Sequence, residues 1–379
     1  RRYRALPCAD RAGWDQRLWW LARPLFLLPG NDRWTEHLAR MTLADILSEA
    51  GNAYGIRWGD DLREITVRFG WPVAWSAETP RLGGMGEITV VGHQGSPSVH
   101  FIPASGALEE PYAAGEGDWE LRAPAPRERY APAYADSFVA FPHQAAVFRR
   151  GESTLVVAAY ELPGEAGFAG DSLAVALVLA SGPGQAPVIA RSSRPDGVLL
   201  AVAPAGALVL SLEALSRPAR RVARARYALP TPAATPVTLS DLLLFDPADS
   251  VPPELSRVLE RALPSGDLGA RRRVGVYWEV YRRHGGAEPL RLDLAVRRTG
   301  GGILRRAARA VGLAEPEQPV RLEWEEVPAF ESGRVARALF LDLSALGRGR
   351  YRIELTVRPA DQPPLTVARD LRLGAPARP

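Results

Sequence analysis

The chain has 379 residues, a length that predicts two or three domains rather than a single core. Its hydrophobic fraction of 46% and charged fraction of 24% are those of a soluble globular protein and exclude wholesale disorder. The net charge is only +4, and the 47 basic residues, all of them arginine, are scattered among 43 acids. This argues against nucleic-acid binding, which usually concentrates basic residues on one face.

Residues 1–128 carry the helical signal and predict an N-terminal α+β domain. Residues 31–51 begin with the capping pair Asn-Asp and end in glycine, with apolar residues at helical spacing between them. Apolar and polar residues alternate over 65–69 and again over 87–91, which predicts two strands. We therefore expect a small sheet beneath helices.

The rest of the chain predicts β structure. Residues 136–230 contain strand-length apolar runs separated by Gly/Pro turns, which is typical of a β-sandwich of about 100 residues. Residues 237–376 repeat this texture and predict a second, immunoglobulin-like sandwich. Pro/Ala-rich links near 124–135 and 230–237 separate the three zones. The expected fold is thus multidomain, an α+β domain followed by two immunoglobulin-like β-sandwiches.

No segment predicts a transmembrane helix, because Pro204-Ala205-Gly206 interrupts the apolar run 198–212. The single cysteine, Cys8, cannot form an internal disulfide. The chain begins with Arg1 rather than Met, so we expect that an upstream segment has been removed or left out, and a signal peptide or lipid anchor would fit there.

An acidic stretch raises the question of catalysis. Asp60 and Asp61 are adjacent, with Glu64 one helical turn on. Paired carboxylates can serve as acid and base when their environments separate their pKa values. Adjacent residues in a turn point apart, however, so we favour a structural role in which Asp61 braces a turn and Trp58 packs beneath it.

The same stretch carries a family resemblance. Counted back from "FGWP" at Phe69–Pro72, the "RWGDD" of Arg57–Asp61 is similar to the Gly-Trp-x-Thr-Asp motif of the GWxTD-domain family of bacterial envelope proteins. Trp58 and Asp61 match, whereas Arg57 stands where the family has Gly and Asp60 where it has Thr.

Three later segments resemble the family's C-terminal sandwich, namely 239–245, 276–281 and 341–357. The chain is identified as a divergent member. The resemblance implies an envelope-associated protein with immunoglobulin-like domains and no established reaction. It assigns Trp58, Asp61, Gly70 and Pro72 to a structural turn.

Two segments are candidate partner-binding sites. Seven of the ten Trp lie between positions 14 and 75, and Trp with Arg is the composition of binding hot spots. The first candidate segment, "RLWWLARPLFLLPG", contains Trp19, Trp20, Arg23 and Phe26, and the alternative is that it simply wraps a helix as core. The second is a basic run at Arg305, Arg306 and Arg309 that could meet an acidic partner or anionic headgroups, or be a solvated hairpin.

Other motifs of chemistry are missing from the sequence. The five His show no metal-ligand spacing, and neither a nucleophile elbow nor a Walker pattern occurs. We therefore expect no catalytic residue, no cofactor and no metal, and no nucleic acid or small-molecule substrate as partner.

The function that fits these features is a non-enzymatic, periplasmic or otherwise extracytoplasmic scaffold or accessory subunit. Its partner would be an integral membrane protein complex or a membrane surface, and one version is an extrinsic subunit of a photosynthetic reaction centre–antenna assembly. Two alternatives remain open at this point. One is an envelope-polymer hydrolase that uses Asp60, Asp61 and Glu64, and the other is a carbohydrate-binding module that uses exposed Trp.

Overall fold

The computed structural model describes residues 2–50, 58–78, 88–93, 99–121, 128–164, 167–168, 172–231, 235–252, 254–283, 288–299 and 320–375. Contacts divide the chain into two compact units, each made of three stretches. Unit 1 comprises Arg1–Phe141, Pro163–Ser193 and Ala207–Pro230. Unit 2 comprises Pro142–Leu162, Arg194–Gly206 and Thr231–Pro379.

Unit 1 contains most of the helical structure. Its helices are α1 (Arg2–Ala5), α2 (Cys8–Leu21), α3 (Asp32–Glu49), α4 (Asp60–Phe69), α5 (Ser105–Glu109) and the short 3-10 helix η1 (Glu116–Trp119). The predicted helix over 31–51 is confirmed as α3, and the Asn31 side chain caps it by accepting a 3.2 Å hydrogen bond from the Trp34 backbone N–H.

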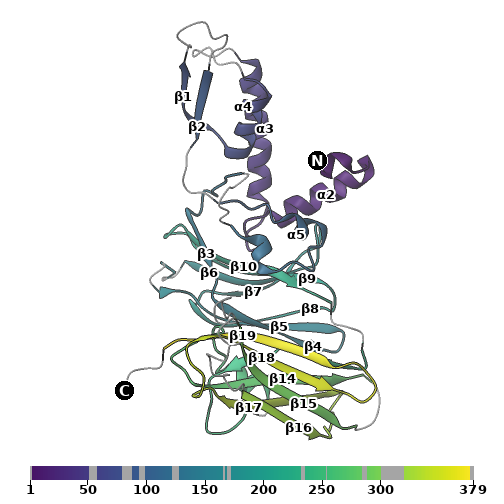
Figure 1. Cartoon of the computed structure of the whole chain (residues 1–379). Coiled ribbons are helices and arrows are strands. Elements are labelled where there is room, and N and C mark those ends of the chain that lie inside the picture. Colours follow the sequence, from purple (N-terminus) through teal and green to yellow (C-terminus); the bar gives the residue numbers. More distant parts are fainter. Residues whose placement is uncertain are drawn as a thin grey trace, which may run out of the picture. The chain divides into compact units, whose positions relative to one another are not determined.

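The strand predicted over 65–69 is wrong, because these residues end helix α4, which lies along α3 (Figure 1). Leu62 and Thr66, four residues apart, form its buried face. Acidic residues in its first turn and Arg68 in its last complement the helix dipole. A five-residue window could not separate helical from strand spacing.

Gly70 ends α4 with a positive φ of 89°, which disfavours other residues. The chain then forms β1 (Pro72–Glu78), which pairs antiparallel with β2 (Ile88–His93). The second predicted strand, 87–91, is thus confirmed, with its bounds shifted to β2.

A five-stranded sheet completes unit 1. Its strands, in spatial order, are β3 (Ser137–Ala140), β10 (Arg221–Leu229), β9 (Leu208–Ser216), β6 (Leu173–Ala180) and β7 (Val188–Ser192). All nine residues of β9 are buried. One face packs against the end of α2 and the segment that follows it, because Leu21, Leu25 and Phe26 belong to the same core as residues of β6, β9 and β10.

Unit 2 contains three sheets. The first has the order β4 (His143–Arg150), β5 (Ser153–Glu161), β8 (Asp196–Pro204). The second contains β11 (Val237–Leu239), β14 (Arg273–Arg282), β12 (Leu243–Phe245) and β17 (Arg334–Asp342). The third has the order β13 (Asp267–Gly269), β19 (Leu365–Leu373), β18 (Gly349–Arg358), β15 (Leu290–Thr299), β16 (Val320–Glu326). Helix α6 (Leu255–Leu259) connects β12 to β13.

Hydrophobic cores among the described residues pack these sheets together. In one, inward residues of β14 such as Trp278 pack with inward residues of β15, β18 and β19, which makes a β-sandwich. In another, Phe148 of β4 and Val157 of β5 pack with Phe245 and Tyr277.

The protein is therefore mostly β, with several sheets. Among the described helices, none has the length and apolar character needed to cross a membrane. The predicted domain limits, 1–128, 136–230 and 237–376, stay a prediction about independently folding parts, as does the separate N-terminal α+β domain.

Candidate functional site

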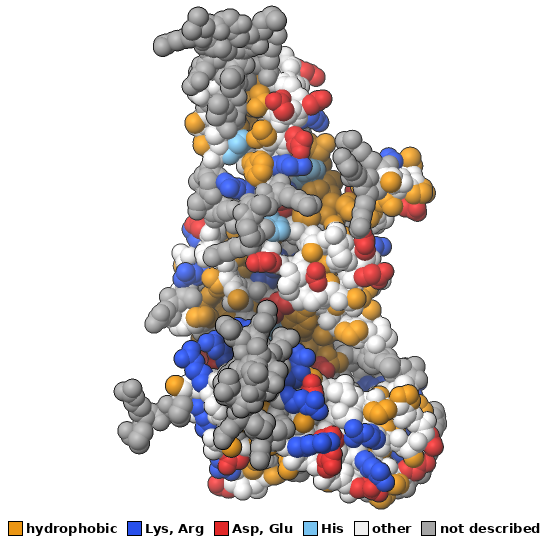
Figure 2. Space-filling model, viewed as in Figure 1, with side chains coloured by type: hydrophobic (Ala, Val, Ile, Leu, Met, Phe, Trp, Pro, Cys, Tyr) orange, Lys and Arg blue, Asp and Glu red, His pale blue; other side chains and the backbone are white. Residues whose placement is uncertain are grey.

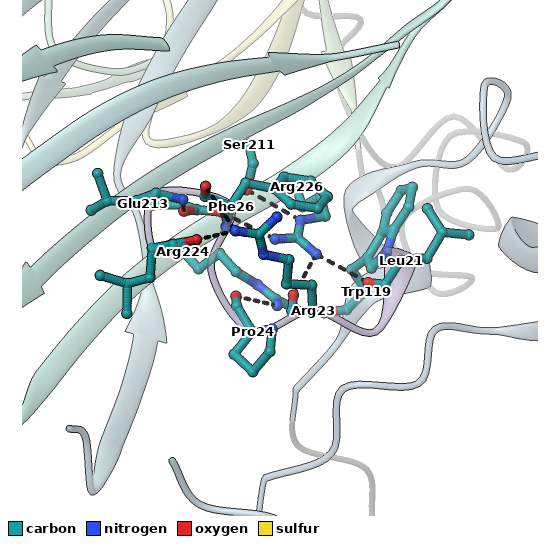
Figure 3. A network of polar contacts seen from close by, with 11 residues as sticks. Leu21, Arg23, Pro24, Phe26, Trp119, Ser211, Glu213, Arg224 and Arg226 are labelled. Carbon is teal, nitrogen blue, oxygen red and sulfur yellow. Dashed lines mark hydrogen bonds and ion pairs between the residues drawn. The ribbon is translucent and has the colours of Figure 1, made fainter. Parts of the chain in front are cut away.

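A buried ion pair fixes the Trp-rich N-terminal segment on the sheet of unit 1 (Figure 3). Glu213 of β9 and Arg226 of β10 are both 0% exposed, and an Arg226 nitrogen donates to a Glu213 oxygen at 3.0 Å. The Glu213 carboxylate also accepts from the Ser211 hydroxyl at 2.7 Å. It further accepts from the backbone N–H groups of Phe26 at 2.9 Å and Leu27 at 2.7 Å.

Arg224 and Arg226 of β10 satisfy carbonyl groups in the same segment. Arg226 donates to the carbonyls of Leu21 at 3.1 Å and Arg23 at 2.9 Å, and Arg224 donates to Pro24 at 3.0 Å. Burial lowers the pKa of both Arg224 and Arg226. Because unpaired backbone groups are costly to bury, this network holds residues 22–27, which follow α2, in a fixed, non-helical path.

The network determines how far Phe26 and Arg23 are buried and what they contact. Phe26 is 3% exposed, and the Arg226 guanidinium lies 3.9 Å from its ring centroid, so Phe26 is a core residue and offers a partner almost no surface. Arg23 is half-buried and donates to the Leu28 carbonyl, and burial lowers its pKa. The alternative in which the segment wraps a helix as core thus holds for Phe26.

Trp19 and Trp20 are half-buried. Trp20 stacks on Phe26 with ring centroids 5.9 Å apart. The Trp19 ring is 4.6 Å from that of Trp34 and 4.5 Å from that of His37. Trp19 therefore belongs to an aromatic cluster that joins α2 to α3, and only part of its ring faces outward.

Helix α3 buries charge and exposes apolar side chains. Arg33 is 2% and Arg40 7% exposed, whereas Trp34, Leu38 and Ile46 are 37%, 43% and 57% exposed. We call these three residues the α3 apolar face. Figure 2 shows hydrophobic side chains gathered between α2 and α3. Ala44 is buried on the same side as the two arginines, but the large apolar side chains Trp34, Leu38 and Ile46 face outward, unlike the usual arrangement in which a helix turns its apolar side to the core.

The buried arginines of α3 have specific partners. Arg33 pairs with Glu128, which also accepts from the backbone N–H of Phe101 at 3.2 Å, and burial lowers the pKa of Arg33 to about 10. Arg40 donates to the carbonyls of Arg68 at 3.0 Å and Arg129 at 2.8 Å. Arg40 thereby caps the C-terminus of α4, whose last carbonyls have no partner within the helix.

His37 lies between these charges. Its partial burial, and next the positive charges of Arg33 and Arg40, lower its pKa from 6.5 to about 4. At neutral pH the ring is therefore uncharged, which suits its stacking on Trp19 and Trp34.

The acidic stretch forms the exposed first turns of α4. Asp60, Asp61 and Glu64 are exposed, and Glu64 forms a 2.6 Å ion pair with Arg68. Gly59 is the N-cap residue of α4, and no side chain makes a capping hydrogen bond there. Asp61 lies in the first turn of this helix and does not brace a turn before a strand, as the sequence had suggested.

The other predicted turn residues are placed as follows. Trp58 is half-buried and Pro72 is buried. Two features favour glycine at position 70. Its φ is positive, and an added Cβ would lie 3.0 Å from an Arg40 nitrogen. Arg57, Arg305, Arg306 and Arg309 lie outside the described residues. Within the described ranges, His, Cys, Asp and Glu form no group able to hold a metal ion.

Sequence reasoning missed Glu213, Arg224 and Arg226. A signal existed, since Glu213 is the only charged residue of β9 and the two arginines lie on one face of the next strand. Unit 2 also contains a buried carboxylate that pairs with an arginine. Glu279 is 1% exposed, pairs with Arg150 at 2.6 Å and accepts from the hydroxyl of Tyr281 at 2.6 Å.

Comparison with known proteins gives distant structural likenesses only. No protein-family model and no curated protein matches the chain. It is similar to the PmoD soluble domain from Methylocystis sp., with 13% identity and a TM-score of 0.21, over 35% of this chain and 89% of that one.

It is also similar to the chicken CNTN1 FN1–FN3 domains, with 11% identity and a TM-score of 0.21, over 65% and 70% of the two chains. Escherichia coli alpha-2-macroglobulin matches with 11% identity and a TM-score of 0.20, over 68% of this chain and 24% of that one. Likenesses of this size carry no argument about what the chain does.

Proposed function

We propose that this chain is a non-enzymatic scaffold or accessory subunit that docks on a membrane protein complex through the α3 apolar face. The site would be extracytoplasmic, as the GWxTD-like motif implies. The observation that carries the proposal is helix α3, which exposes Trp34, Leu38 and Ile46 while Arg33 and Arg40 are buried.

This arrangement favours a partner because it has a cost that the chain alone does not offset. The buried guanidinium groups have partners within the chain, whereas each exposed apolar side chain forgoes part of the benefit of burial, which is about 1.5–3 kcal/mol for a fully buried side chain. Contact with a partner would recover that benefit. Trp19 would form the floor of the contact, because its ring packs against Trp34.

A protein partner is favoured over bare lipid because charge is close to the face. Glu36 and Asp45 lie on the same helix, and Asp45 pairs with Arg63 of α4. Burying such ion pairs in lipid would be costly, whereas a protein surface can supply polar groups opposite them.

The test is co-sedimentation of the full chain with membranes from its source. Leu38→Glu puts a charge in the middle of the α3 apolar face and should reduce the bound fraction at least tenfold, while circular dichroism and the melting temperature stay close to the native values. The matched control is Val202→Glu, which changes a 54% exposed apolar residue of β8 in unit 2 to the same charge.

Retained binding by folded Leu38→Glu contradicts the proposal. So does equal loss in the two variants, since it would mean that any added charge weakens a non-specific association. Hydrolysis of envelope polymers, lost in Asp60→Asn or Glu64→Gln with membrane binding retained, would favour the hydrolase instead.

A further inference from the structure

One end of the third sheet of unit 2 gathers arginines around a hollow of about 280 Å³. The arginines are Arg298 of β15, Arg348 just before β18, Arg350 at the start of β18, and Arg372 of β19. Thr299 and Gly349 also line the hollow, and none of the described residues that line it is acidic. Four arginines thus line a space about the size of a small ligand.

The strand register places two of these arginines directly opposite each other. Arg350 pairs with Arg372 across β18 and β19, and with Thr299 across β15 and β18. The next residue of β18, Tyr351, is buried, so Arg350 lies on the outer face of the sheet, as does its partner Arg372. Like charges directly opposite each other on one face destabilise a sheet.

The cross-strand pair two residues further along β18 and β19 consists of opposite charges. Arg352 lies opposite Asp370, and the two form an ion pair at 2.6 Å. Near the hollow, Arg372 pairs with Asp267 at 3.7 Å, and both side chains are more than half exposed, which makes this a weak pair. The positive charge at the sheet end is therefore only partly offset.

Arg298 is held in place from the side. It donates to the Arg348 carbonyl at 2.8 Å and lies over Gly349, where an added Cβ would be 3.0 Å from one of its nitrogens. Its guanidinium also lies 5.7 Å from the Tyr351 ring centroid. A donor fixed in this way loses little conformational entropy when it binds.

We propose that this hollow binds a phosphate group, either on a soluble compound or on a lipid headgroup. The planar guanidinium fork matches phosphate oxygens bidentately, and a terminal phosphate carries about 1.5–2 negative charges at pH 7. That charge would remove the repulsion between Arg350 and Arg372. The site uses residues of unit 2 only and is independent of the α3 apolar face.

Two probes test the site on the full chain. The first is inorganic phosphate, titrated at constant ionic strength against a chloride reference and followed by isothermal calorimetry and the melting temperature. The second is sedimentation with phosphatidylcholine vesicles that contain or lack phosphatidic acid. Each probe is applied to the native chain, to Arg350→Gln, and to Arg352→Gln as the matched control on the same face of β18.

We expect saturable binding to the native chain and to Arg352→Gln, with affinity about tenfold lower in Arg350→Gln because one charge-assisted contact is lost. Binding of free phosphate without vesicle binding assigns a soluble source, and vesicle binding that free phosphate competes away assigns a headgroup. The proposal is overturned if neither probe binds saturably, or if Arg350→Gln and Arg352→Gln weaken binding equally. A phosphate-free readout separates folding from binding, since Arg350→Gln should melt no lower than the native chain once the like-charge pair is gone.

Discussion

Glu213 and Arg226 meet 3.0 Å apart with neither side chain exposed to water, and the carboxylate of Glu213 also receives two backbone N–H groups from a segment 186 and 187 residues earlier in the chain. One carboxylate thus joins the N-terminal segment to the sheet of unit 1. Its removal should therefore affect much more than a single ion pair.

Glu213→Gln should lower the free energy of unfolding by about 3–5 kcal/mol, because Arg226 would be left buried without a countercharge. Urea unfolding followed by tryptophan fluorescence measures the change. Asp370→Asn, which breaks the exposed pair with Arg352, should cost only about 0.2–1 kcal/mol. The double variant Glu213→Leu/Arg226→Met should not recover the loss, because the backbone groups that the pair satisfies in the N-terminal segment would stay buried without partners. Equal losses in Glu213→Gln and Asp370→Asn would refute the assignment.

Acid should destabilise unit 1 through His37. Its folded-state pKa of about 4 lies below the unfolded value of 6.5, so the unfolded chain takes up a proton first as the pH falls. The stability that the neutral ring contributes is complete above pH 6.5 and is lost between about pH 6.5 and 4. Melting temperatures over this range should fall less steeply in His37→Gln, and parallel curves for the two proteins would contradict the prediction.

The two ends of α4 should differ in sensitivity. Asp61→Ala should lower the free energy of unfolding by about 0.3–1 kcal/mol, because an exposed first-turn acid acts through the helix dipole. Gly70→Ala should cost more than about 1 kcal/mol, because its φ of 89° disfavours alanine and the added methyl group would press on Arg40. Chemical denaturation of both variants decides the order, and a larger effect of Asp61→Ala would restore a bracing role.

Cleavage of the first predicted link should not separate its two sides. If trypsin cuts after Arg122 or Arg127, the piece that ends there should stay bound, because Arg33 pairs with the buried Glu128 and the Tyr130 hydroxyl donates to Asp32 at 3.0 Å. Native size-exclusion chromatography of the nicked protein, followed by denaturing electrophoresis of the single peak, measures this. Two separate folded fragments would support the independent domain at 1–128 instead.

Sequence patterns predicted several helices and strands, which are formed by contiguous residues. The strand-length apolar runs expected within 136–230 include β5 and β6, which are bounded by turn residues. The window 65–69 failed because alternation and helical spacing coincide over so few positions. The contacts of Glu213 with Phe26 and Leu27 could not be predicted, since they depend on how the chain brings distant segments together, which no local period encodes.

The interleaving of the two units has a consequence for how the chain can be made and varied. Strands β4, β5 and β8 leave the ribosome before residue 231, yet their core partners Phe245 and Tyr277 are synthesised later, so these strands must wait with apolar faces uncovered. Unit 1 likewise needs β9 and β10, which follow β8 in the chain. No single division of the chain leaves either unit complete, so recombination at one junction cannot exchange one unit for that of another protein. A chaperone that shields β4 and β5 during synthesis would raise the yield of folded protein.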